Sequence, residues 1–277
     1  MDTLPGILYR FTLGTSPIAQ LLQVVLLIYI SYYVLLIGKG LMDAIGTYGD
    51  STTYLLPDLY DGTQVIYQDP NLRGSNTIYP SVNAPSGLEF SYSCFLLINS
   101  RTFQGANDGL RHIFHKGTAT FKPLMCPGVF VRNNTNSLVV FMNEATKWDS
   151  RCELHNIPIG KFFHLAIVVR NMNVDIYING NVAYRMTLSS VPLQNFENVC
   201  VFSSQQFDDS ATSPENPFVV LGSATGFISR LLYTGYALNY EQIDRQVRMG
   251  PSTKLVSATQ SLPPYLADDW WVNYTAK

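Results

Sequence analysis

The sequence predicts an all-β protein of antiparallel strands, preceded by one transmembrane α-helix and followed by one short helix. Three observations carry this prediction. Apolar and polar residues alternate over 163–186, an uncharged apolar segment lies near the N-terminus, and a helix-capping pattern follows at Asn239. Period-two alternation is typical of strands, because successive side chains point to opposite faces of a sheet.

The segment 160–186, GKFFHLAIVVRNMNVDIYINGNVAYRM, contains three predicted strands. Alternating apolar runs begin at Phe163, Val174 and Val182. Asn179-Gly180 separates the second run from the third, and this dipeptide is typical of a type I′ turn, which needs positive φ at both central positions. Spacing alone therefore predicts a three-stranded antiparallel meander.

The wording of this meander resembles the core of the concanavalin A-like lectin/glucanase superfamily, in its laminin-G and pentraxin-like branch. The family usually has Trp where this chain has Phe162 or Phe163, and a second similar segment, GFISRLLYTGYALNYEQI, occupies 226–243. The resemblance implies an antiparallel jelly-roll sandwich over 87–250, in which N- and C-terminal strands pair. This fold hosts binding modules, hydrolases and structural spacers, so it leaves the function open.

An apolar segment without a charged residue lies between Arg10 and Lys39. As a helix rising about 1.5 Å per residue, 18–37 spans roughly 30 Å, the thickness of a bilayer's hydrocarbon core. We predict an N-terminal segment over 1–17 and a transmembrane helix over 18–38. A cleaved signal peptide is the alternative, but the apolar run is too long for one. One basic residue on each side gives no orientation.

Polar residues on this helix share one face. At 100° per residue, Gln20, Gln23 and Ser31 fall within an arc of about 80°, opposite Tyr29 and Tyr33. Amides on one face indicate contact with another helix, where they are satisfied away from lipid. We predict helix–helix contacts through these three residues. The alternative is that both glutamines lie near the interface and reach water.

Two segments flanking the sandwich are predicted to contact partners. Residues 39–86 show no sustained period and are predicted to form an extended spacer, part of which is expected to supply the first strand. The tail, 251–277, carries adjacent tryptophans that are unfavourable in water and are predicted to dock on a neighbour or on the domain. Tyrosines recur in the spacer and are predicted to form a partner-binding strip, and the alternative is that they pin the spacer to the domain. The predicted partner contacts are Tyr48, Tyr54, Tyr60, Tyr67, Trp270 and Trp271.

The short helix is predicted over 239–249. Asn239 caps it, Gln242 completes a capping box three residues on, and Gly250-Pro251 ends it.

Catalytic patterns are missing from the sequence, which predicts that the chain is not an enzyme and has no catalytic residues. The ExDxxE pattern of glycosidases on this fold does not occur, and Asp208-Asp209 would point to opposite faces of a strand. His164 belongs to the strand signature and is predicted to be structural. His112 and His115 are three residues apart, so in a regular strand they face opposite sides and make a poor metal pair.

No cofactor is predicted. Calcium is the open alternative, because many members of the resembled family hold one Ca²⁺ at the rim of the sandwich through oxygen ligands. Asn107-Asp108 and Asp208-Asp209 lie in loops that could reach this rim. Their pattern is too loose to assign a ligand. Cys126 and Cys152 flank a predicted hairpin pair and are the pair favoured for a disulfide, although the sequence leaves the disulfide state open. Cys94 and Cys200 lie in strand-like surroundings, where free buried thiols are common.

Three functions remain open. The favoured one is a non-enzymatic, single-pass membrane protein that links a lipid bilayer to a layer of structural proteins. Such proteins resemble minor capsid proteins of large icosahedral DNA viruses, which implies a virion location between the inner membrane and the capsid shell. The alternatives are a membrane-anchored glycan-binding lectin and a divergent glycosidase, which needs two carboxylates about 5 to 9 Å apart. The net charge of −2 gives no case for nucleic acid.

Overall fold

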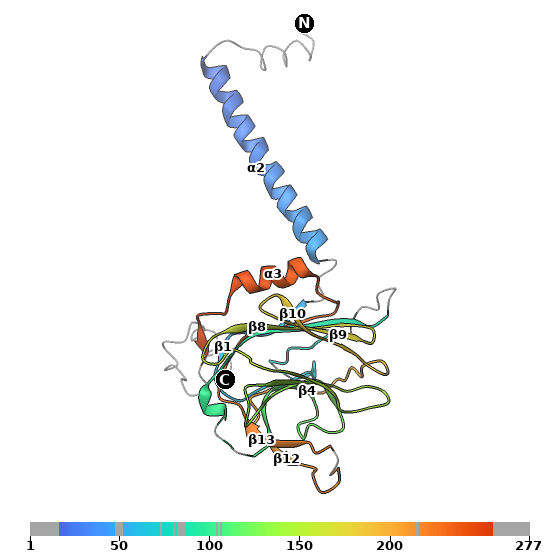
Figure 1. Cartoon of the computed structure of the whole chain (residues 1–277). Helices are drawn as coiled ribbons and strands as arrows, with labels where there is room; N and C mark the ends of the chain where they lie inside the picture. The colour runs from blue at the N-terminus through green and yellow to red at the C-terminus, as the bar shows by residue number, and fades with distance from the viewer. Residues whose placement is uncertain are drawn as a thin grey trace, which may run out of the picture. The chain divides into compact units, whose positions relative to one another are not determined.

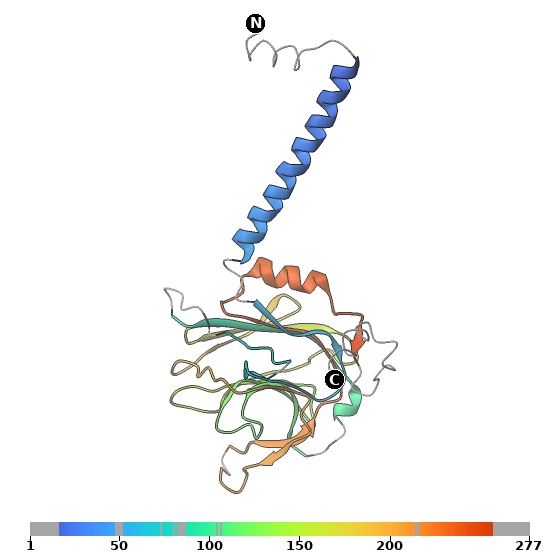
Figure 2. The same ribbon diagram turned by 180° about the vertical axis from the view of Figure 1, so that it is seen from behind.

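The computed structural model describes residues 17–47, 52–72, 74–79, 81, 87–103, 105, 107–213 and 216–256. The chain divides after Asp50 into two compact units. The first contains helix α2 (Pro17–Thr47), and the second contains all the strands and helix α3 (Tyr240–Met249), drawn in Figure 1 and from behind in Figure 2.

Two sheets packed face to face form the second unit (Figures 1 and 2). We call the seven-stranded sheet, ordered β10-β9-β8-β3-β14-β1-β15, the first sheet. Its strands are β10 (Asn181–Thr187), β9 (Asn173–Ile178), β8 (Phe163–Arg170), β3 (Glu89–Ile98), β14 (Gly226–Thr234), β1 (Thr52–Tyr60) and β15 (Leu255–Val256). All its pairs are antiparallel except β1 with β15.

The second sheet has eight strands, with β12-β13-β4-β5-β6-β7 as its main order and β11 joining β2 to β4. Its strands are β12 (Gln206–Asp208), β13 (Val219–Ser223), β4 (Leu110–Gly117), β5 (Met125–Arg132), β6 (Leu138–Met142), β7 (Ser150–Leu154), β11 (Val199–Val201) and β2 (Gln64–Ile66). A short 3-10 helix, η1 (Ser100–Phe103), follows β3.

The predicted all-β sandwich is confirmed. Strands β8, β9 and β10 form the expected meander, and Asn179 and Gly180 have φ angles of 50° and 84° at its hairpin turn. Strand β1 pairs antiparallel with β14, as expected for N- and C-terminal strands of such a fold.

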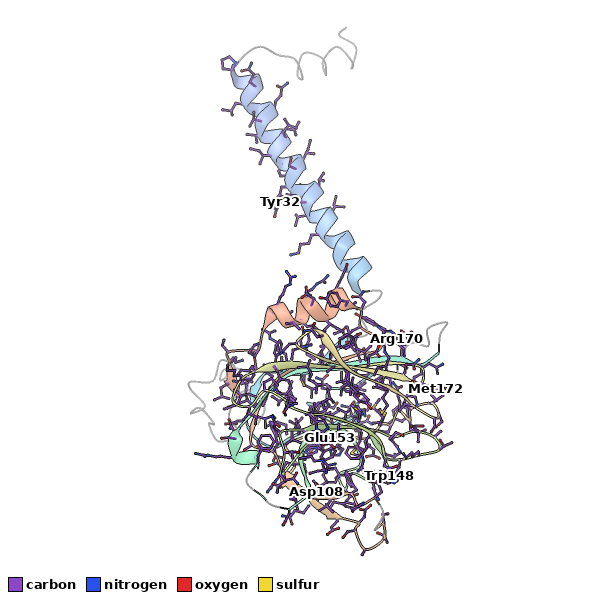
Figure 3. The ribbon with its side chains drawn as sticks, viewed as in Figure 1. Tyr32, Asp108, Trp148, Glu153, Arg170 and Met172 are labelled. Carbon is purple, nitrogen blue, oxygen red and sulfur yellow. The ribbon has the colours of Figure 1, made fainter. Side chains whose placement is uncertain are left out.

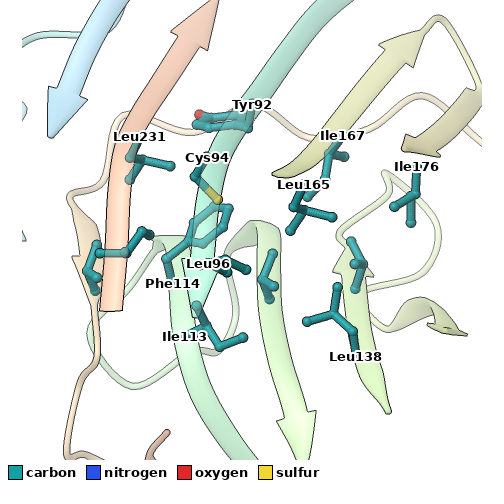
Figure 4. Packing of buried hydrophobic residues seen from close by; sticks show 14 of the residues in the cluster. Tyr92, Cys94, Leu96, Ile113, Phe114, Leu138, Leu165, Ile167, Ile176 and Leu231 are labelled. Carbon is teal, nitrogen blue, oxygen red and sulfur yellow. The ribbon is translucent and has the colours of Figure 1, made fainter. Parts of the chain in front are cut away.

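The main core fills the space between the two sheets. Figure 4 shows Leu96, Leu165 and Leu231 of the first sheet facing Phe114 and Leu138 of the second sheet. Two smaller clusters cover the outer faces. A ring-rich cluster that includes Phe130 and Phe218 lies on the second sheet, and a cluster that includes Ile243 lies between α3 and the first sheet. Both sheets are therefore buried on both faces over part of their area.

Helix α3 has the predicted capping box. Gln242 N–H donates to Asn239 Oδ1, and Asn239 N–H donates to Gln242 Oε1, each at 2.9 Å. The helix ends before Gly250, whose φ is 68°. Ile243 is its one buried residue, and it packs against Ala166 and Val168 of β8.

Helix α2 continues to Thr47, past the predicted boundary at residue 38. The glycines at 38 and 40 lie inside it, although each is less favourable in a helix than Ala by about 1 kcal/mol. The expected spacer over 39–86 thus contains the end of α2 and the strands β1 and β2. Within the described part of the chain, no helical segment combines the length and hydropathy that crossing a membrane requires. The transmembrane assignment over 18–38 stays a prediction.

The expected disulfide between Cys126 and Cys152 is wrong, because all four cysteines are free and buried. Cys126 lies on β5 and Cys152 on β7, with β6 between them. Strands two positions apart are about 9.6 Å from each other, whereas a disulfide needs Cα atoms within about 7 Å. Burial raises the pKa of both thiols to about 12. The expected free thiols at Cys94 and Cys200 are confirmed.

Candidate binding groove

The predicted contact residues fall on several parts of the molecule. Tyr60 packs against the main core, whereas Tyr54 and Tyr67 are exposed. Asn76 joins the main chains of these last two, because its N–H donates to Tyr67 O at 3.0 Å and its side-chain amide donates to Tyr54 O. Tyr48, Trp270 and Trp271 lie outside the described residues.

On α2, Gln20 is exposed and Gln23 is half-buried. Ser31 lines a shallow depression together with Tyr32, and Figure 3 labels Tyr32. The depression forms because Ser31 is small among larger neighbours, which here are Val24, Leu27, Ile28 and Leu35. Contact of this face with a second helix stays a prediction.

A groove of about 730 Å³ runs along the open side of the sandwich. Edge strand β7 of the second sheet supplies one wall, and β10, the edge strand of the first sheet, supplies part of the other. Its lining residues are 151–158, Ile178, Ala183 and Tyr184. This groove is the candidate functional site, and sequence reasoning missed it because its walls come from different sheets.

A second hollow of about 520 Å³ continues the groove. The two hollows share Glu153, His155 and Asn156, and the second is also lined by Asp108, Arg132 and the loop 134–137. The combined surface is rich in amides and hydroxyls, with Tyr184 as its exposed aromatic ring.

Most charged side chains of the groove are paired, and the exception is Arg151, whose guanidinium donates to the Asn216 amide oxygen and makes no ion pair among the residues that the structure describes. The Arg132 guanidinium donates from Nε and Nη2 to the two carboxylate oxygens of Glu153, both at 2.9 Å, and from Nη1 to Asp108 at 2.7 Å (Figure 3 labels Asp108 and Glu153). These hydrogen bonds from Arg132 lower the pKa of Glu153, while partial burial opposes them. The paired charges around Arg132 suit an uncharged polar ligand better than a strongly charged one, and Arg151 leaves one unpaired positive charge on the lining.

A serine, a histidine and a glutamate meet in this groove without forming a catalytic triad. His155 Nδ1 is 2.9 Å from Ser137 Oγ and 3.8 Å from Glu153 Oε1. A triad needs the nucleophile and the acid on opposite ring nitrogens, so that the base can accept a proton at one while the acid orients the other. Here both contact Nδ1, and Ser137 is buried. The arrangement positions side chains and does not activate a nucleophile.

The edges of both strands are protected from pairing with another strand. Strand β10 has a register shift between Val182 and Tyr184, and β7 carries Arg151 and Glu153. Bulges and charged residues are two devices that blunt sheet edges. The groove is therefore built for side-chain recognition and not for strand addition.

His112 and His115 do not face opposite sides, so that prediction is wrong. The register of β4 against β5 shifts between His112 and Phe114, which inserts one extra residue into β4. Ile113 and Phe114 both enter the main core, and the two imidazoles come together on the outer face. Their ring nitrogens, His112 Nε2 and His115 Nδ1, are 2.8 Å apart.

Hydrogen bonds fix the tautomers of this pair. Ser203 N–H donates to His112 Nδ1 at 2.9 Å, so the proton of neutral His112 is on Nε2 and points to His115 Nδ1. His115 Nε2 then donates to Thr118 O at 3.0 Å. Burial lowers the pKa of His115 to about 4, and burial together with the charge of neighbouring His115 lowers the pKa of His112 well below its usual value. With every ring nitrogen paired, the two histidines are structural and offer no metal site.

The acidic loop residues considered for calcium are engaged with basic partners or main chain. Asp108 is paired with Arg132, and Asp209 is paired with Lys122 and accepts from Phe218 N–H at 2.6 Å. Among the residues that the structure describes, no group of three or more His, Cys, Asp or Glu side chains is placed to hold a metal ion.

No family model and no curated protein matches the chain. Solved structures that resemble it include receptor binding domains of botulinum neurotoxins. That of neurotoxin D has a TM-score of 0.47 and 12% identity, and the match covers 71% of this chain and 46% of that chain. The domain of neurotoxin type G has a TM-score of 0.43 and 12% identity, and the match covers 73% of this chain and 47% of that chain. The domain of the C/D mosaic serotype has a TM-score of 0.44 and 13% identity, and the match covers 58% of this chain and 36% of that chain.

This chain thus spans about half or less of the length of these domains. The likeness is one of fold, and no ligand or role passes from them to this chain.

Proposed function

We propose that the chain is a membrane-anchored, non-enzymatic interaction protein in which α2 enters a bilayer and the sandwich holds a partner beside it. The surface of α2 is the observation that carries this proposal. From Val24 to Ile37 every side chain is exposed, and each is aliphatic or tyrosine except Ser31. An apolar surface of this length is unstable in water.

A bilayer suits this helix for two reasons. A helix satisfies its own backbone groups, which is the condition for entering lipid. In addition, the hydroxyls of Tyr29 and Tyr33 lie 3.0 Å apart on neighbouring turns, so each reduces the penalty of taking the other out of water. The groove of the sandwich supports the binding half of the proposal, because it is an open polar surface and its Ser137, His155 and Glu153 have no catalytic geometry.

A virion minor capsid protein is the specific form of this proposal that the sequence resemblance supports. It would tie the inner membrane to the capsid shell, with other structural proteins of the assembly as partners. Identifying cross-links between the groove and one abundant shell protein in intact particles would support this form, and a map containing self-links alone would contradict it.

The membrane half is tested by flotation of the full chain with phospholipid vesicles after washing in alkaline carbonate. We expect the unchanged chain to float. The double variant Leu27→Lys, Val34→Lys should sediment, since each lysine at the centre of a membrane helix costs about 3 kcal/mol. The matched control, Val182→Lys with Leu255→Lys, places two lysines at exposed sandwich positions and should float. An unchanged chain that carbonate extracts would refute the anchor.

Glycan binding is the second candidate, and the lining of the groove favours it. Tyr184 offers a ring for stacking, and Asn134, Asn136 and Asn156 offer amides beside the paired charges of Arg132. Glycan arrays read with and without calcium should show signals that Tyr184→Ala removes and that the exposed control Tyr240→Ala keeps. An array without signal would leave a protein as the ligand of the groove.

A further inference from the structure

A second surface lies away from the groove and shares none of its lining residues. Three aromatic side chains, Tyr67, Tyr79 and Phe196, are exposed to 48%, 69% and 84%. Scattered exposed apolar residues are normal on protein surfaces. These three are different because hydrogen bonds tie their segments together. We call them the aromatic rim.

Gln68 is the residue that ties the rim together. It is buried, and its side chain donates from Nε2 to Asn76 O at 2.8 Å while Oε1 accepts from Ile78 N–H at 2.8 Å. Its own N–H donates to Asn198 Oδ1 at 3.1 Å. The segments carrying Tyr67, Tyr79 and Phe196 are thus fixed to one another, next to the paired strands β2 and β11.

The residues beside Phe196 are also fixed to the end of β4. Asn195 Nδ2 donates to Lys116 O at 3.1 Å, Lys116 Nζ donates to Glu197 O, and Gly117 N–H donates to Asn198 O at 3.1 Å. Phe196 therefore projects into solvent from a backbone held on both sides. A rigid exposed aromatic residue loses little entropy on binding, which is typical of residues that dominate an interface.

A cavity of about 40 Å³ opens between Tyr79 and Phe196. Its other lining residues include Lys116, Tyr92, Cys126 and Tyr233. The Tyr233 hydroxyl is buried, the Gln194 amide approaches it as a donor and lowers its pKa, and no described acceptor lies within hydrogen-bond distance of its proton. Lys116 is 5% exposed and makes no ion pair within the described part of the chain. The Tyr233 hydroxyl and the Lys116 ammonium group thus border the cavity, and each can donate a further hydrogen bond to a ligand.

Lys116 stays mostly protonated near neutral pH although it is buried. Burial lowers the pKa of Lys116 to about 8, and the charge of Glu197 opposes this shift. At pH 7 most Lys116 side chains are therefore ammonium groups, with three N–H donors and a carbonyl as the described acceptor. A buried cation without a paired anion favours a ligand that supplies one.

We propose that this site binds a partner protein through one aspartate or glutamate side chain, whose carboxylate enters the cavity and is held by Lys116 and Tyr233. The cavity has room for about three water-sized groups, which matches a carboxylate, whereas a benzene ring needs about 150 Å³. Only the carboxylate enters, and apolar neighbours of the acidic residue pack on the aromatic rim. The partner segment is therefore an acidic residue between apolar ones.

The test measures binding of two blocked pentapeptides, Ala-Leu-Asp-Leu-Ala and Ala-Leu-Asn-Leu-Ala, to the full chain in detergent at pH 7. We expect saturable binding of the aspartate peptide and roughly 10- to 100-fold weaker binding of the asparagine peptide, because hydrogen bonds to charged groups are the stronger ones. Lys116→Met should reduce affinity for the aspartate peptide by a similar factor. Phe196→Ala, at an exposed position, should weaken both peptides.

Tyr233→Phe keeps the test decisive if Lys116→Met fails to fold, since it removes one hydroxyl and should weaken the aspartate peptide roughly 2- to 10-fold. Equal binding of the two peptides, or an unchanged affinity in folded Lys116→Met, would overturn the proposal. So would saturable binding of phenylacetate without binding of the aspartate peptide, which would indicate a small-molecule site. The outcome is independent of the membrane anchor and of the groove, because detergent replaces lipid and no residue is shared.

Discussion

The two described helices of this chain meet their surroundings in opposite ways. Helix α2 has 31 residues and exposes aliphatic and tyrosine side chains around its surface from Val24 to Ile37. Helix α3 has 10 residues, buries Ile243 alone and exposes polar side chains. A capping box fixes the start of α3, and one apolar stripe attaches it to the first sheet. The comparison teaches that the pattern of side chains, more than helix propensity, determines whether a helix packs against the sheet through one stripe or presents an apolar surface all round.

Removing the buried contact of α3 should have the largest effect on the sandwich. Ile243→Ala deletes a fully buried side chain that packs against Ala166, Val168 and Tyr177, so we expect a loss of about 2 to 5 kcal/mol in the free energy of unfolding. Urea denaturation of the full chain measures it. Tyr240→Ala, at an exposed position of the same helix, should stay within about 0.5 kcal/mol. Equal effects of both changes would show that α3 does not attach through this stripe.

Acid should weaken the attachment of α3 through His164. This histidine lies with Gln246 and Arg230 around a cavity of about 20 Å³ on the α3 side of the first sheet. Burial lowers its pKa to about 4, and the nearby Gln246 side chain, whose amide oxygen can accept from the charged ring, opposes the shift. As pH falls from 6.5 towards 4, His164 binds a proton in the unfolded state but stays neutral in the folded state. The free energy of unfolding therefore falls by up to about 1.4 kcal/mol per pH unit.

The measurement is the free energy of unfolding between pH 6.5 and 5 in the unchanged chain and in His164→Gln. The variant should show a shallower decline, with the remaining slope coming from other groups such as His112 and His115. Above pH 7 the two curves should run parallel, which serves as the internal control. Identical slopes below pH 6.5 would contradict the assignment.

Removing the cap of α3 should have a smaller effect. Asn239→Ala leaves the Gln242 N–H without its acceptor, and we expect a loss of about 1 kcal/mol. Asn239→Asp keeps an acceptor at the same position and should retain most of the stability. The same urea series compares them, and a neutral alanine variant would show that packing alone fixes the helix start.

The smallest expected effect concerns the polar face of α2. If Gln20 and Gln23 hydrogen-bond across a helix pair, changing both to Leu should weaken self-association in detergent severalfold, at about 0.6 kcal/mol per contact. Energy transfer between labelled chains measures this. Tyr29→Phe with Tyr33→Phe, on the opposite face, is the matched control. Unchanged association of the leucine variant would show that the glutamines do not mediate the contact.

The sequence predicted the features that short-range rules determine. Asn179-Gly180 fixed the β9–β10 hairpin because few residues accept positive φ at both positions, and Asn239 with Gln242 fixed the start of α3. The first alternating run was predicted to begin at Phe163, and β8 begins at that residue.

Features that depend on strand register or on distant segments escaped prediction. One extra residue in β4 brought His112 and His115 to the same face, and nothing in the local alternation signals such a bulge. The groove joins β7 to β10, and the aromatic rim joins Tyr67 to Phe196 across more than a hundred residues. Phe196 lies in a segment without period, so only the hydrogen bonds of Gln68 and Asn195 reveal its role.

The four buried thiols are intrinsic probes of local opening, because each reacts only when the strands around it separate. Cys94 belongs to the first sheet, and Cys126, Cys152 and Cys200 belong to the second. Because burial keeps Cys126 and Cys152 protonated far above neutral pH, an alkylating reagent reaches a thiolate only after the surrounding strands separate. The order in which the four sites are labelled therefore reports which sheet loosens first, without any engineered probe.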